Sequence, residues 1–144
     1  MPLTDLQLAY VAGIIDGEGC IRTNNNISKQ PVIRVHVTNT RLDLILKLKE
    51  WFGGYTWINE THKYNPKAKA SHIWEVSAKQ AASFLTAILP YLFLKREQAE
   101  LVLALQATKK TGNNVSLDIQ CIRTGIVNRL HELNQKGVVA ISHS

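Results

Sequence analysis

The spacing of apolar residues along the chain changes period several times. Residues 6–16 place apolar side chains three and four positions apart, which is typical of a helix, whereas residues 32–39 alternate apolar and polar side chains, which is typical of a half-buried strand. In the first half of the chain these patterns predict a helix from a Thr4 or Asp5 cap to Asp16, strands at Cys20–Ile27 and Val32–Asn39, a helix at Arg41–Phe52, and strands at Tyr55–Thr61 and Ser71–Ser77.

Helical spacing returns in the second half of the chain. It predicts helices at Ala78–Leu89, ended by Pro90, at Lys95–Thr108, and at Ser116–Asn134, with a frayed segment at Gly137–Ser144. The order of elements predicts an α+β domain of αββαββα type with additional C-terminal helices. Its antiparallel four-stranded sheet should be covered on one side by helices. We expect one domain over residues 1–144, with its core at 6–110 and a helical extension at 111–144.

One face of the first predicted helix is almost bare. On a helical wheel this bare face consists of Ala9, Ala12, Gly13, Asp16 and Gly17. Each interior Gly costs a helix roughly 1 kcal/mol relative to Ala, so we expect a compensating close approach of another backbone. This predicts a helix–helix contact, a dimer interface formed by Ala9, Ala12, Gly13 and Asp16.

Acidic residues follow at the end of the same helix. Asp16 and Glu18 lie at the negative end of the helix dipole, where a carboxylate costs about 0.3–1 kcal/mol. If a second copy packs on the bare face, two such acidic turns meet, and carboxylates that close hold either a proton or a hard divalent cation such as Mg²⁺. Alternatively, Gly17 and Gly19 only end the helix. Spacing alone leaves both interpretations open.

Composition narrows the class of partner. A net charge of +6 and a pI near 9.5 favour a polyanion such as nucleic acid, although a basic protein can also be merely soluble. Cys20 and Cys121 are too few for a disulfide framework or a CxxC zinc site, and the five histidines lack metal-ligand spacing. No leader or membrane-length apolar run occurs, so we expect a cytoplasmic protein.

Two stretches of the chain resemble a known family. VAGIIDGEG (Val11–Gly19) resembles the LAGLIDADG motif of the homing endonucleases, and PYLFLKREQA (Pro90–Ala99) resembles a second block of that family. The resemblance covers about residues 6–110. It implies that Glu18 binds the catalytic metal with help from the Gly17 carbonyl, and that Lys95 lies near the scissile phosphate. It further implies that Asn39, where the family often carries Gln, positions solvent. Without the resemblance, Lys95 could be an exposed lysine at the start of a helix, and Asn39 could be a turn residue.

The activity implied by this resemblance is that of a homing endonuclease active in intron homing. A homodimer would make a double-strand cut in a long, partly palindromic DNA target by Mg²⁺-dependent phosphodiester hydrolysis, leaving 3′ overhangs. Two alternatives remain open. One is a non-cleaving nucleic-acid binder, such as an intron-splicing maturase or a regulator. The other is a structural dimer with no nucleic-acid role.

The uncovered sheet face would then lie along the DNA major groove. In Ser71–Ser77 we expect Trp74 and Val76 to point inward and Glu75 outward, and Trp57 could equally be a packing residue. The residues expected to contact bases are Arg22, Asn24, Asn26, Arg34, His36, Thr38, Tyr55, Trp57 and Asn59. Loop lysines expected to contact phosphates are Lys29, Lys63, Lys67 and Lys69.

Overall fold

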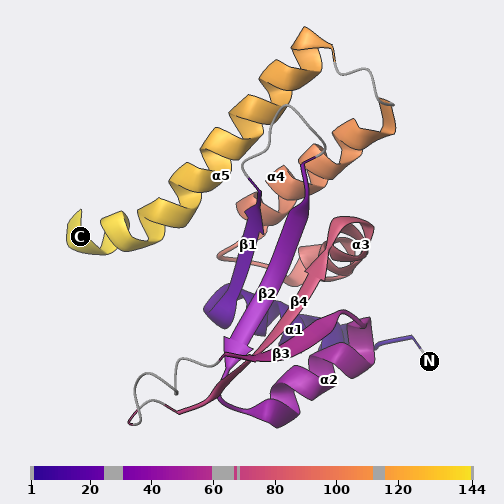
Figure 1. Ribbon diagram of the computed structural model, residues 1–144, viewed down its shortest axis with the longest axis vertical. Helices are drawn as coiled ribbons and strands as arrows, with labels where there is room; N and C mark the ends of the chain where they lie inside the picture. The colour runs from indigo at the N-terminus through magenta and orange to yellow at the C-terminus, as the bar shows by residue number, and fades with distance from the viewer. Residues whose placement is uncertain (1, 25–30, 60–66, 68, 112–115, 144) are drawn as a thin grey trace.

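The computed structural model describes residues 2–24, 31–59, 67, 69–111 and 116–143, with side chains left aside at 110–111 and 136–143 (Figure 1). The elements follow the predicted αββαββα order with C-terminal helices added. They are α1 (Asp5–Glu18), β1 (Gly19–Thr23), β2 (Ile33–Asn39), α2 (Leu42–Phe52), β3 (Tyr55–Asn59), β4 (Ser71–Ser77), α3 (Ala78–Ile88), η2 (Leu89–Tyr91), α4 (Arg96–Ala107), η3 (Thr108–Thr111) and α5 (Leu117–His143). The predicted fold class is confirmed.

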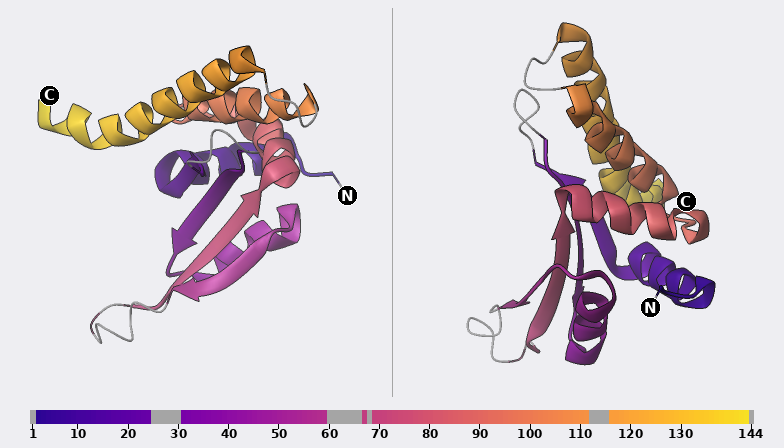
Figure 2. Two further views of the ribbon diagram at one scale, coloured as in Figure 1. Left: turned by 45° about the horizontal axis from the view of Figure 1, so that its top comes forward. Right: turned by 90° about the vertical axis from the view of Figure 1, so that its right-hand side faces the viewer.

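The four strands form one antiparallel sheet in the order β1-β2-β4-β3. All the helices lie on one side of it, which leaves the other face open (Figures 1 and 2). We call this uncovered side the open face of the sheet. Within the described residues, no helix is both long enough and apolar enough to cross a membrane.

The core lies between the sheet and the helices. Ile33, Val35 and Val37 of β2 are fully buried, as their alternation with polar residues predicts. Trp74 of β4 is also fully buried, and its indole N–H donates to the Gly53 carbonyl oxygen at 2.7 Å. A glycine is required at position 54, where φ is +96° and a Cβ atom would lie 2.6 Å from the Glu75 carbonyl oxygen.

The end of α1 differs from the prediction. The helix continues to Glu18, so this acidic residue occupies its last turn, and β1 begins directly at Gly19. A Cβ atom at Gly19 would approach the Ile15 Cα atom to 2.8 Å, so only glycine lets the strand leave the helix so abruptly. The start of α1 agrees with the Thr4 cap, because Thr4 and Gln7 form a reciprocal capping box.

Other boundaries shift at the edges of the sheet and at the C-terminus. β1 ends at Thr23 and β3 at Asn59. Of the residues predicted to continue these strands, Asn24 is described but not part of β1, and the others lie outside the described residues. α5 begins after Ser116, whose hydroxyl accepts from the Ile119 N–H at 3.2 Å. The helix predicted to end at Asn134 is longer than expected, since α5 runs to His143 through most of the segment predicted to fray, Gly137–Ser144.

Candidate active site and nucleic-acid interface

Glu18 and Asn39 meet where α1 ends and β2 ends. The Asn39 side-chain N–H₂ donates to Glu18 Oε2 at 2.6 Å, and the Asn39 side-chain oxygen accepts from the Arg41 N–H at 2.8 Å. Asn39 therefore serves as the turn residue before α2 and also contacts Glu18. The Glu18 side chain remains exposed to solvent, with its position set by a neighbouring amide.

Lys95 approaches the same end of α1 from a distant part of the chain. Its Nζ atom donates to the carbonyl oxygens of Ile15 and Asp16, each at 3.0 Å, across 80 and 79 residues of sequence. A cation here is favoured by the negative end of the helix dipole. Lys95 is half-buried and holds the N-cap position of α4, so the structure places it beside the acidic turn.

Asp16 makes the reciprocal contacts. Its two carboxylate oxygens accept from the backbone N–H groups of Phe93 and Lys95, each at 2.9 Å. These bonds fix the segment between η2 and α4 against α1. Both oxygens of the Asp16 carboxylate are thus engaged by backbone N–H groups within the protomer, whereas Glu18 accepts through Oε2 from the Asn39 side chain.

The predicted bare face of α1 divides into two parts. Ala12 is fully buried and belongs to the same core cluster as Val11 and Ile15, so its prediction as an interface residue is wrong. The position of Ala12 around the helix explains this, because Ala12 directly follows Val11 and faces the core with it. Ala9 and Gly13 are exposed, as is Gly17.

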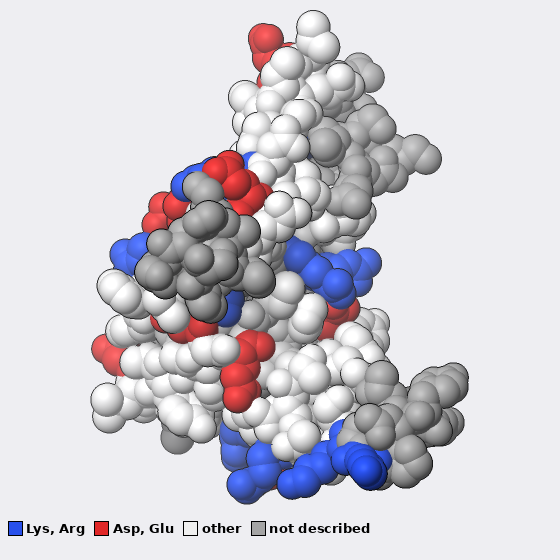
Figure 3. Space-filling model, turned by 90° about the vertical axis from the view of Figure 1, so that its left-hand side faces the viewer, with Lys and Arg blue, Asp and Glu red and all other residues white. Residues whose placement is uncertain are grey.

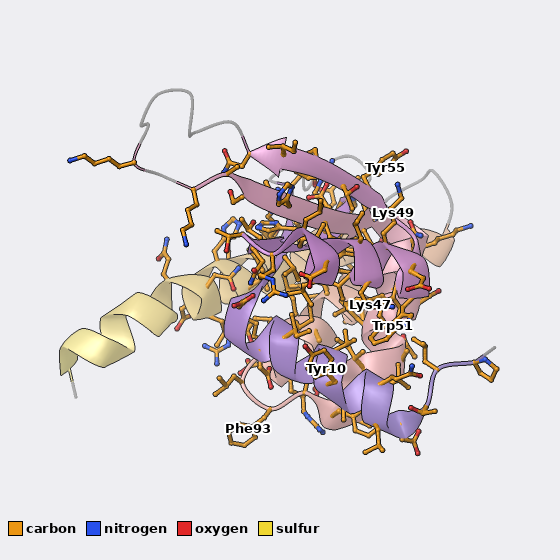
Figure 4. All side chains as sticks on the ribbon, turned by 90° about the horizontal axis from the view of Figure 1, so that it is seen from below. Tyr10, Lys47, Lys49, Trp51, Tyr55 and Phe93 are labelled. Carbon is orange, nitrogen blue, oxygen red and sulfur yellow. The ribbon has the colours of Figure 1, made fainter. Side chains whose placement is uncertain are left out.

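The outer face of α1, formed by Leu6, Ala9, Tyr10, Gly13 and Gly17, is exposed in the protomer. A Cβ atom added at Gly13 or Gly17 would find nothing within 4 Å, and Leu6 and Tyr10 are 84% and 60% exposed. Figure 4 shows Tyr10 and Phe93 on the helical side of the molecule, opposite Tyr55. A shallow hollow runs along this face and is lined by Ala9, Tyr10, Gly13, Ile14, Gly17, Glu18, Asn39 and Leu44.

Arginine side chains project from the open face of the sheet. Arg22 of β1 and Arg34 of β2 are cross-strand partners, and both form ion pairs with Glu75 of β4. The pairs join Arg22 Nη2 to Glu75 Oε1 at 3.4 Å and Arg34 Nη1 to Glu75 Oε2 at 3.3 Å. Trp74 and Val76 point inward, as the sequence predicts. Strand alternation indicates that Glu75 points outward, but sequence reasoning assigned it no role.

His36 lies beside this cluster, paired in register with Cys20 and Glu75. Burial lowers the pKa of its imidazole, and the Arg22 charge lowers the pKa further, against a smaller opposing effect of Glu75. Its Nδ1 atom is buried and finds no hydrogen-bond partner in the part of the chain that the structure describes.

Other predicted contact residues occupy the margins of the open face. The Asn24 side-chain oxygen accepts from the Val32 N–H at 3.1 Å and so closes the end of the β1–β2 pair. Thr38, Tyr55, Trp57, Lys67 and Lys69 are exposed, and Asn59 is partly so; Asn26, Lys29 and Lys63 lie outside the described residues. In Figure 3 basic side chains gather along the lower edge of the molecule and in a second group on its right-hand side, where the outline is hollowed.

The fit of a divalent cation can be judged from the donors present. Among the described residues, no three His, Cys, Asp or Glu side chains come together as a metal-binding group. Mg²⁺ is usually held through one or two carboxylates, with water and phosphate oxygens completing its shell. A single exposed Glu18 beside the carbonyl groups that end α1 fits that requirement, more fully if a second copy adds its own Glu18.

The sheet with one open face and the acidic end of α1 at its edge define the fold of the LAGLIDADG homing endonucleases. A family model described as a LAGLIDADG-like domain matches residues 5–89, and the chain belongs to this family. Lys95 lies just beyond the matched region. A search of curated protein sequences gave no significant match.

Solved structures of homing endonucleases share this fold. I-CvuI in complex with DNA and Mg superposes with a TM-score of 0.71 at 22% identity, over 89% of this chain and 82% of that one. The archaeal intron-encoded I-Vdi141I, also complexed with DNA, gives 0.71 at 13% identity, over 90% and 84%. I-TnaI gives 0.61 at 16% identity, over 94% and 99%.

Proposed function

We propose that this protein is a site-specific homing endonuclease that cuts both strands of a long, partly palindromic DNA target as a homodimer. The observation that carries the proposal is the meeting of Glu18, Asn39 and Lys95 at one end of α1, beside an open sheet face that carries arginines. These three residues come from separate elements, and none of their contacts is needed to continue a helix or strand.

Each residue has a distinct role in the proposed reaction. Glu18 and the Gly17 carbonyl would hold Mg²⁺, which polarises a phosphate and lowers the pKa of bound water. The Lys95 ammonium group has three N–H donors, and two are used by the Ile15 and Asp16 carbonyls. The third can donate to a phosphate oxygen as negative charge develops. Asn39 donates to one oxygen of Glu18 and would thereby hold the carboxylate in place for binding the cation.

Homodimerisation is supported by the outer face of α1. Gly13, in the interior of α1, costs the helix roughly 1 kcal/mol relative to alanine, and Gly17 lies in its last turn. Among the described residues, nothing requires a glycine at either position on steric grounds, because a Cβ atom would meet no other atom within 4 Å. Close packing of a second α1 offsets this cost and brings two Glu18 residues together by two-fold symmetry, one for each DNA strand.

DNA recognition is assigned to the open face of the sheet. Arg22 and Arg34 present guanidinium groups suited to guanine in the major groove, with Tyr55 and Trp57 farther along the face. Lys67 and Lys69 are exposed beyond β3 and β4 and would contact phosphates. Relatives crystallised with target DNA support a DNA partner for this fold.

Cleavage of a randomised supercoiled plasmid library with Mg²⁺, followed by sequencing of cut ends, tests the proposal. We expect 3′ overhangs at a two-fold symmetric site for the wild type, and binding without cleavage for Glu18→Gln. Glu100→Gln, at an exposed position on α4, is the matched control and should cut normally. Specific binding by a wild type that never cuts would instead identify a non-cleaving binder such as a maturase. A wild type that binds no DNA would support the alternative of a structural dimer with no nucleic-acid role.

A further inference from the structure

Glu75 occupies an unusual place on the open face. It is the one acidic residue in the four described strands, and it lies among the residues proposed to meet DNA. Its side chain is 12% exposed, whereas those of Arg22 and Arg34 are 50% and 41% exposed. A carboxylate on a DNA-facing surface repels phosphates, so its presence there lowers affinity and calls for a compensating benefit.

The direct attraction between Glu75 and the two arginines adds little stability. Ion pairs with half-exposed arginines contribute little to the free energy of unfolding. The arrangement does solve a local problem, however. Arg22 and Arg34 are directly opposed across β1 and β2, where two like charges repel each other and splay apart. Glu75 offers one oxygen to each arginine, and Arg22 extends over β2 to reach it.

Each arginine keeps donors for a second partner. A guanidinium group carries five N–H donors, and each contact with Glu75 involves one terminal nitrogen, Nη2 of Arg22 and Nη1 of Arg34. The remaining donors match the two acceptors of a guanine edge in the major groove. Held side by side, the two groups can address neighbouring bases, and the contact with Glu75 favours this direction over one toward a phosphate.

We propose that Glu75 is a positioning residue for base recognition, holding Arg22 and Arg34 toward guanine and away from the phosphate backbone. The proposal rests on the proposed function, in which the open face lies along DNA. Glu75 thereby lowers the affinity for DNA of any sequence and raises the discrimination between sequences. It acts through the two arginines and needs no contact of its own with the bases.

The test compares Glu75→Gln with wild type by selecting bound sequences from randomised DNA without a divalent cation, and by measuring affinity at several salt concentrations. Gln keeps the size of Glu but removes its charge. We expect base preference to fall at least about fivefold at symmetric positions, the lower end of what one bidentate arginine contact provides. The slope of log affinity against log salt should steepen by about one for each freed arginine that contacts a phosphate.

Glu97→Gln is the matched control, because it makes the same charge change in an ion pair that is remote from the sheet, between α4 and Arg129 of α5. It should leave base preference and salt slope unchanged. A second variant, Arg34→Lys, keeps a positive charge but loses the planar fork, and should relax one of the positions affected by Glu75→Gln with no steeper slope.

The outcomes separate the two proposals. A wild type that selects a site, with Glu75→Gln matching it in preference and slope, would overturn the positioning role alone. So would a Glu75→Gln variant with weaker binding to all sequences and a shallower slope, since Glu75 would then be holding the two arginines toward phosphates. A wild type without any sequence preference would overturn the reading role of the open face as well.

Discussion

Replacing Gly13 with Leu should stabilise the monomer and weaken the dimer at the same time. In the isolated protomer the new side chain starts in open space, because nothing lies within 4 Å of a Cβ atom at this position. Leu has a helix propensity close to that of Ala, so the substitution favours the helix by roughly 0.8 kcal/mol. For a chain of this length, such a gain raises the melting temperature by about 3 °C.

In the proposed dimer the sign is reversed. Two leucine side chains would enter a contact in which each glycine presents only a hydrogen atom. Such overpacking costs about 1–3 kcal/mol per inserted side chain. With one leucine from each copy, the dimer dissociation constant should rise by roughly 30-fold or more. Cleavage should fall in parallel, because the two Glu18 residues would separate.

Gly125→Leu is the matched control. Gly125 is an exposed glycine of α5, and a Cβ atom there also meets nothing within 4 Å. Both variants should melt at higher temperature at concentrations below the dimer dissociation constant, but only Gly13→Leu should shift sedimentation in analytical ultracentrifugation toward the monomer. A Gly13→Leu protein that dimerises like the wild type, or a wild type that is monomeric on DNA, would refute the interface.

Four further substitutions probe the remaining contacts. Lys95→Met should slow cleavage less completely than Glu18→Gln and lower the melting temperature, because the Ile15 and Asp16 carbonyls lose their donor; single-turnover kinetics and thermal unfolding measure both effects. His36→Gln should make the melting temperature fall less on acidification below about pH 6.5. The folded-state pKa of His36 is lowered by burial and Arg22, so the unfolded chain binds the extra proton and native stability is lost as pH falls. Lys67→Ala should weaken binding to all sequences alike and reduce the salt slope by about one per subunit, whereas Arg34→Ala should relax preference at a few symmetric positions in a binding selection.

The parts of the fold that depend on neighbouring residues were predictable from the sequence. Thr4 and Gln7 carry the capping box within four residues, and the alternation of β2 separates its buried from its outward side chains. Ala12 shows the limit of such reasoning. A small side chain beside Val11 fits either a buried helix contact or an exposed face, and only the placement of the surrounding elements decides between them.

The candidate site shows the same division. Glu18, Asn39 and Lys95 could be selected through the family resemblance, which stands on residue types and spacing. Their contacts could not be predicted, because the bonds from Lys95 to α1 join segments 79 and 80 residues apart. Glu75 was placed outward by alternation, yet its pairing with Arg22 depends on the strand order β1-β2-β4, which no local pattern encodes.

The mutual bonds between α1 and the start of α4 couple the order of the two segments. Asp16 accepts from two backbone N–H groups of the Phe93–Lys95 segment, and Lys95 donates back to two carbonyl groups of α1. A fluctuation that detaches the amino end of α4 therefore releases the last turn of α1 with it, even while the sheet stays intact. On heating, hydrogen exchange in these two segments should rise together, and the temperature at which catalysis is lost should follow that local opening and precede melting of the strands.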